Sequence, residues 1–98
     1  MIGSVDVTTV YVELFGIPRQ RAGVPRIELN TVVPCIRLRD VLADLALRFP
    51  VLAEECFIDN QLRTGFVANL GGDKFVTDAD TVIPHGQSLL IMSADAGG

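Results

Sequence analysis

Apolar and polar residues alternate along two segments in the first third of the chain. In residues 7–14 the apolar positions are Val10, Val12 and Leu14, and residues 26–33 repeat the same pattern with Ile27 and Leu29 on one face. A period of two is typical of a β-strand with one buried face. The pattern therefore predicts two strands.

The stretch between these strands, residues 19–25, is polar and carries Gly23 and Pro25, so it predicts a loop. Two strands joined by a loop of this kind predict a hairpin. Pro34 ends the second strand, because proline has no N–H to donate to a sheet.

The period then changes to that of an α-helix. The apolar positions that share one helical stripe are Leu38, Val41, Leu42, Leu45, Ala46 and Phe49. Asp44 and Arg48 lie on the other side as a favourable i,i+4 pair. Pro50 closes the helix, since the residue before a proline is pushed out of the α region. At its start, Arg37 stands where a capping Ser or Thr is common, so no cap marks the first residue.

The second half of the chain is less regular. Residues 51–64 are mixed and predict a short helical turn followed by an extended piece. Further strands are predicted at 65–70, 74–76 and 88–92, separated by turns at 71–72, 78–81 and 84–87.

This order of elements, β-β-α-β-β(-β), indicates the α+β class. If the last strand lies beside the first, parallel and central, the result is a mixed sheet of four to five strands packed on one main helix, which is the β-grasp (ubiquitin-like) arrangement. A ferredoxin-like fold or a split sandwich uses the same order, so the pattern alone leaves the topology open. We expect one domain over 1–92 and a flexible tail over 93–98.

Composition narrows the classes of protein. The chain has 98 residues, of which 49% are hydrophobic, which suits one soluble domain. The formal net charge of −4 argues against nucleic-acid binding, which needs clustered Lys and Arg. The sequence shows neither a signal-peptide pattern nor an apolar run of the ~18 residues that span a membrane, so we expect a cytoplasmic protein.

Few side chains suggest chemistry. We expect Cys35 and Cys56 to be two partly buried thiols. The alternative is that one of them is a reactive thiol, which needs a nearby histidine or helix N-terminus. One histidine and two distant cysteines match no metal site. We expect His85 to be a solvated residue of a turn, without a partner. We expect Asp78 and Asp80 to belong to an Asx-type turn and not to a loop that binds a cation.

The informative motif is Gly97-Gly98, which follows four small or polar residues. A tail without side chains can enter a narrow channel of another enzyme. The terminal carboxylate, with a pKa of roughly 3.5, is a poor electrophile until it is adenylated. A sulfur donor can then replace AMP and leave a thiocarboxylate on Gly98. The alternative is a frayed terminus that happens to end in two glycines.

The sequence resembles the ThiS/MoaD group of sulfur carriers, which share ancestry with ubiquitin. The resemblance covers nearly the whole chain and lies in residues 11–16, 38–50, 66–69, 81–89 and Gly97-Gly98. It implies a β-grasp carrier that is not itself an enzyme and holds no cofactor or metal. It also implies two partners: an E1-like adenylyltransferase/sulfurtransferase that uses ATP, and a sulfur-accepting synthase subunit.

The resemblance also assigns residues. Gly98, preceded by Gly97, matches the glycine that the family adenylates and thiocarboxylates. The family's partner surface is the sheet face near the last strand, to which Phe75, Leu90 and Met92 could contribute. Residues 86–88 read Gly-Gln-Ser where many members have Gly-Asp-Glu, and residues 93–96 lack the usual proline. These departures bear on the identity of the partner.

The recipient of the sulfur is left open between molybdopterin (molybdenum cofactor biosynthesis), the thiamine thiazole and another metabolite. Two further functions are compatible with the sequence. One is a ubiquitin-like modifier conjugated through Gly98, and the other is a non-covalent β-grasp binding subunit.

Overall fold

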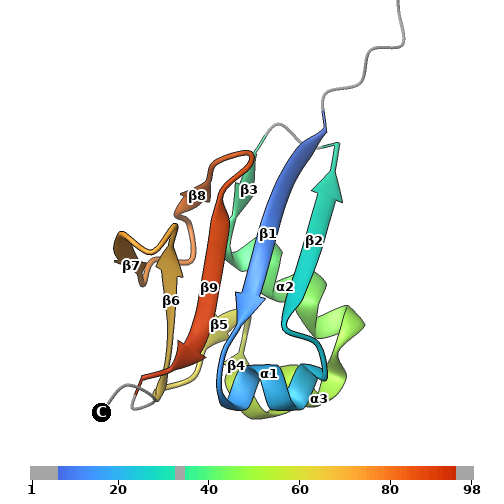
Figure 1. Ribbon diagram of the computed structural model, residues 1–98, viewed down its shortest axis with the longest axis vertical. Helices are drawn as coiled ribbons and strands as arrows, with labels where there is room; N and C mark the ends of the chain where they lie inside the picture. Colours follow the sequence, from blue (N-terminus) through green and yellow to red (C-terminus); the bar gives the residue numbers. More distant parts are fainter. Residues whose placement is uncertain (1–6, 33–34, 95–98) are drawn as a thin grey trace, which may run out of the picture.

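The computed structural model describes residues 7–32 and 35–94, and its centre is a five-stranded mixed sheet with helices on one face (Figure 1). The strands of this sheet, in spatial order, are β2 (Arg26–Thr31), β1 (Thr8–Leu14), β9 (Ser88–Ser93), β6 (Phe66–Leu70) and β7 (Lys74–Val76). The helices are α1 (Ile17–Ala22), α2 (Leu38–Arg48) and α3 (Pro50–Cys56). Two small pairs complete the fold: β3 (Ile36–Arg37) with β8 (Val82–Ile83), and β4 (Phe57–Ile58) with β5 (Gln61–Leu62).

The last strand lies in the middle of the sheet. β9 runs parallel to β1 with Val12 opposite Leu89, and antiparallel to β6 with Ala68 opposite Ile91. β1 and β2 form the predicted antiparallel hairpin. The α+β fold and the β-grasp topology predicted from the sequence are therefore confirmed.

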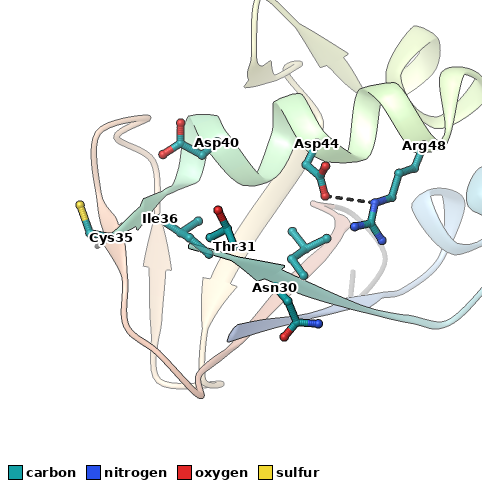
Figure 2. A pocket seen from close by; sticks show the side chains of 8 residues that line it. Asn30, Thr31, Cys35, Ile36, Asp40, Asp44 and Arg48 are labelled. Carbon is teal, nitrogen blue, oxygen red and sulfur yellow. Dashed lines mark ion pairs between the residues drawn. The ribbon is translucent and has the colours of Figure 1, made fainter. Parts of the chain in front are cut away.

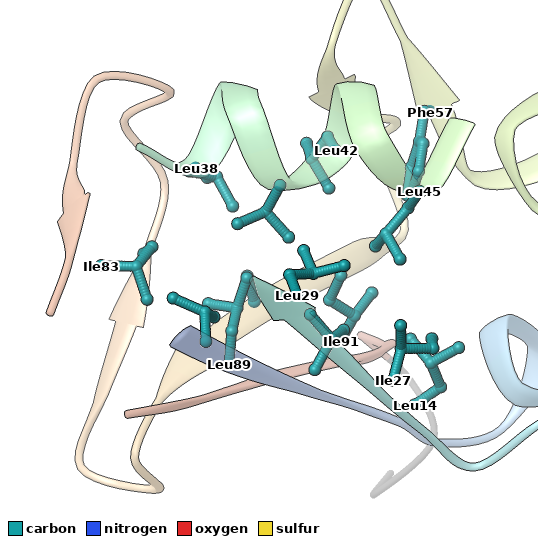
Figure 3. Close-up of a cluster of buried hydrophobic side chains, with 14 of the residues drawn as sticks. Leu14, Ile27, Leu29, Leu38, Leu42, Leu45, Phe57, Ile83, Leu89 and Ile91 are labelled. Atoms are coloured by element: carbon teal, nitrogen blue, oxygen red, sulfur yellow. The ribbon is translucent and has the colours of Figure 1, made fainter. Parts of the chain in front are cut away.

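The core forms where the period-two and period-3.6 patterns meet (Figure 3). From the sheet, Val10, Val12 and Leu14 have at most 1% of their surface exposed. From α2, the buried residues of the predicted stripe are Leu38, Val41, Leu42 and Leu45. Each such side chain contributes roughly 1.5–3 kcal/mol by its burial. The core thus holds α2 firmly across one face of the sheet.

The loop predicted over 19–25 is wrong in its first half, because α1 occupies Ile17–Ala22. Pro18 lies in the first turn of this helix, where its missing N–H costs nothing and its fixed φ suits the helix. Gly23 ends the helix in the left-handed conformation, with φ of 80°. Gly23, interpreted as a loop signal, instead ends a helix, and the helix begins before the predicted loop.

The start of α2 is capped from far along the chain. The backbone N–H groups of Leu38 and Arg39 donate to the carbonyl oxygens of Thr81 (2.9 Å) and Ala79 (3.0 Å). These are two of the donors that a helix N-terminus leaves without an intrahelical partner. The missing Ser or Thr cap is thus replaced by the 79–81 loop.

Asp40 completes this helix start. Its carboxylate accepts a hydrogen bond from the N–H of Arg37 at 2.8 Å, which is the N3 half of a capping box. Arg37 in turn donates to the carbonyl oxygen of Asp80 at 2.7 Å, and Arg39 forms an ion pair with the carboxylate of Asp80.

The second predicted strand ends early: β2 stops at Thr31 rather than at residue 33, so it ends before Pro34, which lies outside the described residues. The other differences are small. The mixed segment 51–64 is α3 followed by the β4–β5 pair, and β9 extends one residue beyond the predicted end, to Ser93. The two-residue strands β3 and β8 were not predicted, since two residues show no period. In the described part of the chain, no helix reaches the length and apolarity that crossing a bilayer requires.

Candidate functional site

The sheet face opposite the helices, here called the open face, carries the predicted partner residues of β9. Leu89, Ile91 and Ser93 are buried, whereas the alternate residues Leu90 and Met92 are only half-buried. Because successive side chains of a strand point to opposite faces, Leu90 and Met92 project from the open face.

Phe75 belongs to the same face. Across the sheet, Glu13 of β1 lies opposite Leu90, Leu90 opposite Asn69 of β6, and Asn69 opposite Phe75 of β7. Directly opposed residues of paired strands share a face, so these four form one row across the open face. In the neighbouring row, Met92 lies opposite Val67.

Phe75 has 65% of its surface exposed. Together with Leu90, Met92 and Val67 it forms an apolar strip across β7, β6 and β9. The structure thus brings Phe75, Leu90 and Met92 together, and a contiguous apolar strip is the kind of surface that marks contact with another protein.

Asn69 lies within this strip and was not singled out from the sequence. It is 8% exposed, and its Oδ1 is buried without a hydrogen-bond partner among the described residues. A buried polar atom without a partner costs about 1–3 kcal/mol. No sequence signal could reveal this residue, because its burial depends on neighbours in two other strands.

Gly97 and Gly98 lie outside the described residues, so their predicted role is not tested. The strand that leads to them ends at Ser93.

The two cysteines are separate and chemically unlike. Cys56, at the end of α3, is fully buried; this burial raises the pKa of its thiol to about 11, with Glu55 adding to the rise and Arg21 opposing it. It is therefore a neutral core thiol, more deeply buried than predicted. Cys35 is half-buried, as predicted.

Cys35 lines a cavity of about 400 Å³ between β2 and α2 (Figure 2). Asp44 and Arg48 in its wall form the predicted i,i+4 ion pair, with 3.1 Å between Oδ2 and Nε. Over residues 7–32 and 35–94, no three His, Cys, Asp or Glu side chains gather as metal ligands would.

His85 is exposed, as predicted, but the expectation that it lacks a partner is wrong. Its Nδ1 accepts a hydrogen bond from the backbone N–H of Thr9 at 3.0 Å. The 84–87 turn folds against the start of β1, a contact across 76 residues that the local sequence does not indicate. The Asx turn is present as predicted: Asp78 Oδ1 accepts the N–H of Asp80 at 2.8 Å.

Comparison with known proteins gives matches to the fold but not to the sequence. No family model matches this sequence, and no curated protein matches it. Solved structures match over nearly the whole chain. Small archaeal modifier protein 1 from Haloferax volcanii is 19% identical, with a TM-score of 0.74 over 92% of this chain and 99% of that one.

Two further structures have similar scores. A putative molybdopterin converting factor, subunit 1, from Pyrococcus furiosus is 24% identical, with a TM-score of 0.69 over 88% of this chain and 97% of that one. A chain of the Amycolatopsis orientalis BexX/CysO complex is 19% identical, with a TM-score of 0.71 over 91% and 99%. At these identities the likeness shows a shared fold, and it confirms the ubiquitin-like β-grasp fold that the resemblance to the ThiS/MoaD group implied.

Proposed function

We propose that this protein is a sulfur carrier whose working group is the carboxylate of Gly98. In the first step a carboxylate oxygen attacks the α-phosphorus of ATP in an E1-like partner enzyme, and pyrophosphate leaves. In the second step a hydrosulfide donor attacks the acyl carbon, a C–S bond forms, the C–O bond to AMP breaks and AMP leaves. Gly98 then carries a thiocarboxylate, whose soft sulfur is presented to an acceptor.

One observation carries this proposal: β9 contributes side chains to the open face and is also the strand that precedes the tail. It places Leu90 and Met92 beside Phe75 on the open face, and the same strand leads the chain toward Gly97-Gly98. The five residues after Ser93 can span at most about 17 Å. An enzyme that docks on the open face would thus have Gly98 within reach of an adjacent nucleotide site.

The similar structures support the same function. They are a putative molybdopterin converting factor subunit, a chain of the BexX/CysO complex, and a small archaeal modifier protein. These names describe a subunit, a member of a complex and a modifier, which supports a carrier role for this chain. For this chain we assign ATP to the adenylating partner and the final transfer to a sulfur-accepting synthase subunit, in the cytoplasm.

The test is mass spectrometry of the protein purified from its own host, intact and as C-terminal fragments. The expected result is the exchange of one oxygen for sulfur at Gly98. Fragmentation is required, because oxidation of Met1 or Met92 adds nearly the same mass. A plain carboxylate that persists after incubation with ATP, sulfide and the host's adenylating enzyme would overturn the proposal.

A variant that lacks Gly98 is the matched control. It should fold with unchanged thermal stability, since the core ends at β9, and it should lose all ATP-dependent activation. If the host phenotype of this deletion equals wild type, Gly98 has no carrier role, and a non-covalent binding subunit becomes the better description.

The likeness to small archaeal modifier proteins favours a second candidate function, a protein modifier joined through Gly98 to lysines of other proteins. The same adenylation serves both functions. Isopeptide-linked conjugates carrying the C-terminal glycine remnant in host lysates would identify the modifier, whereas a thiocarboxylate without conjugates would identify the carrier.

A further inference from the structure

Glu13 and Arg26 are the charged residues of the row across the open face, and the Glu13 carboxylate is unpaired among the described residues. Glu13 is half-buried beside Leu90, yet in the described part of the chain its carboxylate makes no ion pair or hydrogen bond. Arg26 lies directly opposite in β2, but its guanidinium stacks on the ring of Tyr11, 4.5 Å from the centroid. Arg26 therefore forms no ion pair with Glu13, although it remains a neighbouring positive charge on the open face.

Beside Glu13 the open face is hollowed into a depression of about 370 Å³. Its other lining residues are Gly71, Gly72, Gly86, Gln87, Ser88 and Leu90. Gly72 and Gly86 have φ of +84° and +83°, and a Cβ added to either would meet nothing within 4 Å. Their backbone conformation favours glycine, and the absence of side chains leaves the depression open.

The charge of this depression has one sign. Among its lining residues Glu13 alone has an acidic or basic side chain, while the others offer backbone groups, one hydroxyl and one amide. A half-buried carboxylate next to an apolar strip is partly desolvated already, so a cation that reaches it interacts more strongly than in open water. The depression therefore fits a long cationic side chain.

We infer that this depression receives an arginine side chain of the adenylating enzyme, whose guanidinium pairs with the carboxylate of Glu13. The inference rests on the proposed function and names the contact that orients the enzyme on the open face. Arginine suits the site better than lysine, because its planar guanidinium is less strongly hydrated, can bind a carboxylate through two hydrogen bonds, and keeps further N–H groups for Gln87 and backbone carbonyls.

The experiment compares the affinity of the host's adenylating enzyme for variants of the full chain by calorimetry without ATP, so that Gly98 chemistry is not needed. Glu13→Gln keeps the shape and removes the charge, and it should weaken binding about tenfold. Glu54→Gln, which removes the same charge from the exposed side of α3, is the matched control and should change affinity less than twofold. Raising the salt concentration should weaken the wild type more than Glu13→Gln.

A second variant tests the depression itself. Ser88→Phe keeps Glu13 but occupies the space, and it should weaken binding at least as much. In turnover assays Glu13→Gln should raise KM and leave kcat unchanged, because Glu13 makes its contact away from the reacting carboxylate.

The outcomes of the two proposals are distinct. If Glu13→Gln binds the enzyme as tightly as Glu54→Gln, the arginine contact is wrong while the carrier function stands. If the enzyme binds with the predicted dependence on Glu13 but never modifies Gly98, the contact stands and the carrier function is wrong.

Discussion

The two faces of the central sheet differ in how completely their apolar side chains are covered. On the face toward the helices, Leu89 and Ile91 are fully buried in an apolar core. On the open face, Phe75 is exposed, the buried Oδ1 of Asn69 lacks a partner among the described residues, and Glu13 is half-buried. Both faces are built from the same strands, so the difference lies in alternate residues.

This difference indicates what each face is for. Burial against α2 gives the inner face its favourable free energy, and its residues are apolar except at the end of β9, where the buried Oγ of Ser93 lacks a partner among the described residues. The open face keeps groups that cost stability or gain nothing in the isolated protein. Under the proposed function a second protein covers these groups, and docking supplies the missing apolar contacts and charge.

Leu89 and Leu90 test the comparison most directly, because they are neighbours in β9 whose side chains point to opposite faces of the sheet. Leu89→Ala should lower the free energy of unfolding by about 3 kcal/mol, because it opens a cavity in the core. Leu90→Ala should lower it by less than about 1 kcal/mol and should weaken binding of the adenylating enzyme. Urea denaturation and calorimetry measure the two effects, and equal losses of stability would show that the faces do not differ.

The stability of the protein at alkaline pH tests whether the Cys56 thiol, on the helix side of the sheet, is excluded from water. The pKa of the Cys56 thiol is about 11 in the folded protein, above its ordinary value of 9.0, so the unfolded chain loses the proton first. The free energy of unfolding should therefore fall as pH rises from 9 toward 11, by about 1 kcal/mol at pH 10. In Cys56→Ala this part of the pH dependence should disappear. If the free energy of unfolding falls with pH equally in both proteins, the Cys56 thiol is not buried as described.

Asn69 tests how much stability the protein loses by burying an unpaired polar atom on the open face. Asn69→Val should raise the free energy of unfolding by about 1 kcal/mol, because it removes a buried acceptor without a partner and favours the strand. Asn30→Val is the matched control, since Asn30 accepts from Thr9 Oγ1 at 2.7 Å and donates to Glu28 at 3.0 Å. Loss of stability in Asn69→Val, measured by thermal denaturation, would show that its amide finds a partner in solution.

Phe75 gives the smallest expected change in stability. With 65% of its surface exposed, Phe75→Ser should alter the free energy of unfolding by less than about 0.5 kcal/mol. The same change should weaken the adenylating enzyme's affinity. If Phe75→Ser leaves that affinity intact, the apolar strip is not the docking surface.

Much of this fold could be predicted because its signals are local. The alternation of Val10, Val12 and Leu14 predicted β1, and the stripe from Leu38 to Phe49 predicted α2 within one residue of its observed end. The open face was predicted in part: Phe75, Leu90 and Met92 were named, but nothing in the sequence indicated that they share a face with Glu13 and Asn69.

The sequence by itself determined the period of each long element, because side chains two residues apart in a strand, or three to four in a helix, lie on one face wherever the element is placed. Only the tertiary structure decided the partners of these elements. The cap of α2 by the 79–81 loop, the bond from Thr9 to His85, and the row that joins Glu13 to Phe75 all depend on strand register. Which elements pair is set by contacts between residues far apart in the sequence, and such contacts leave no periodic signal in the chain.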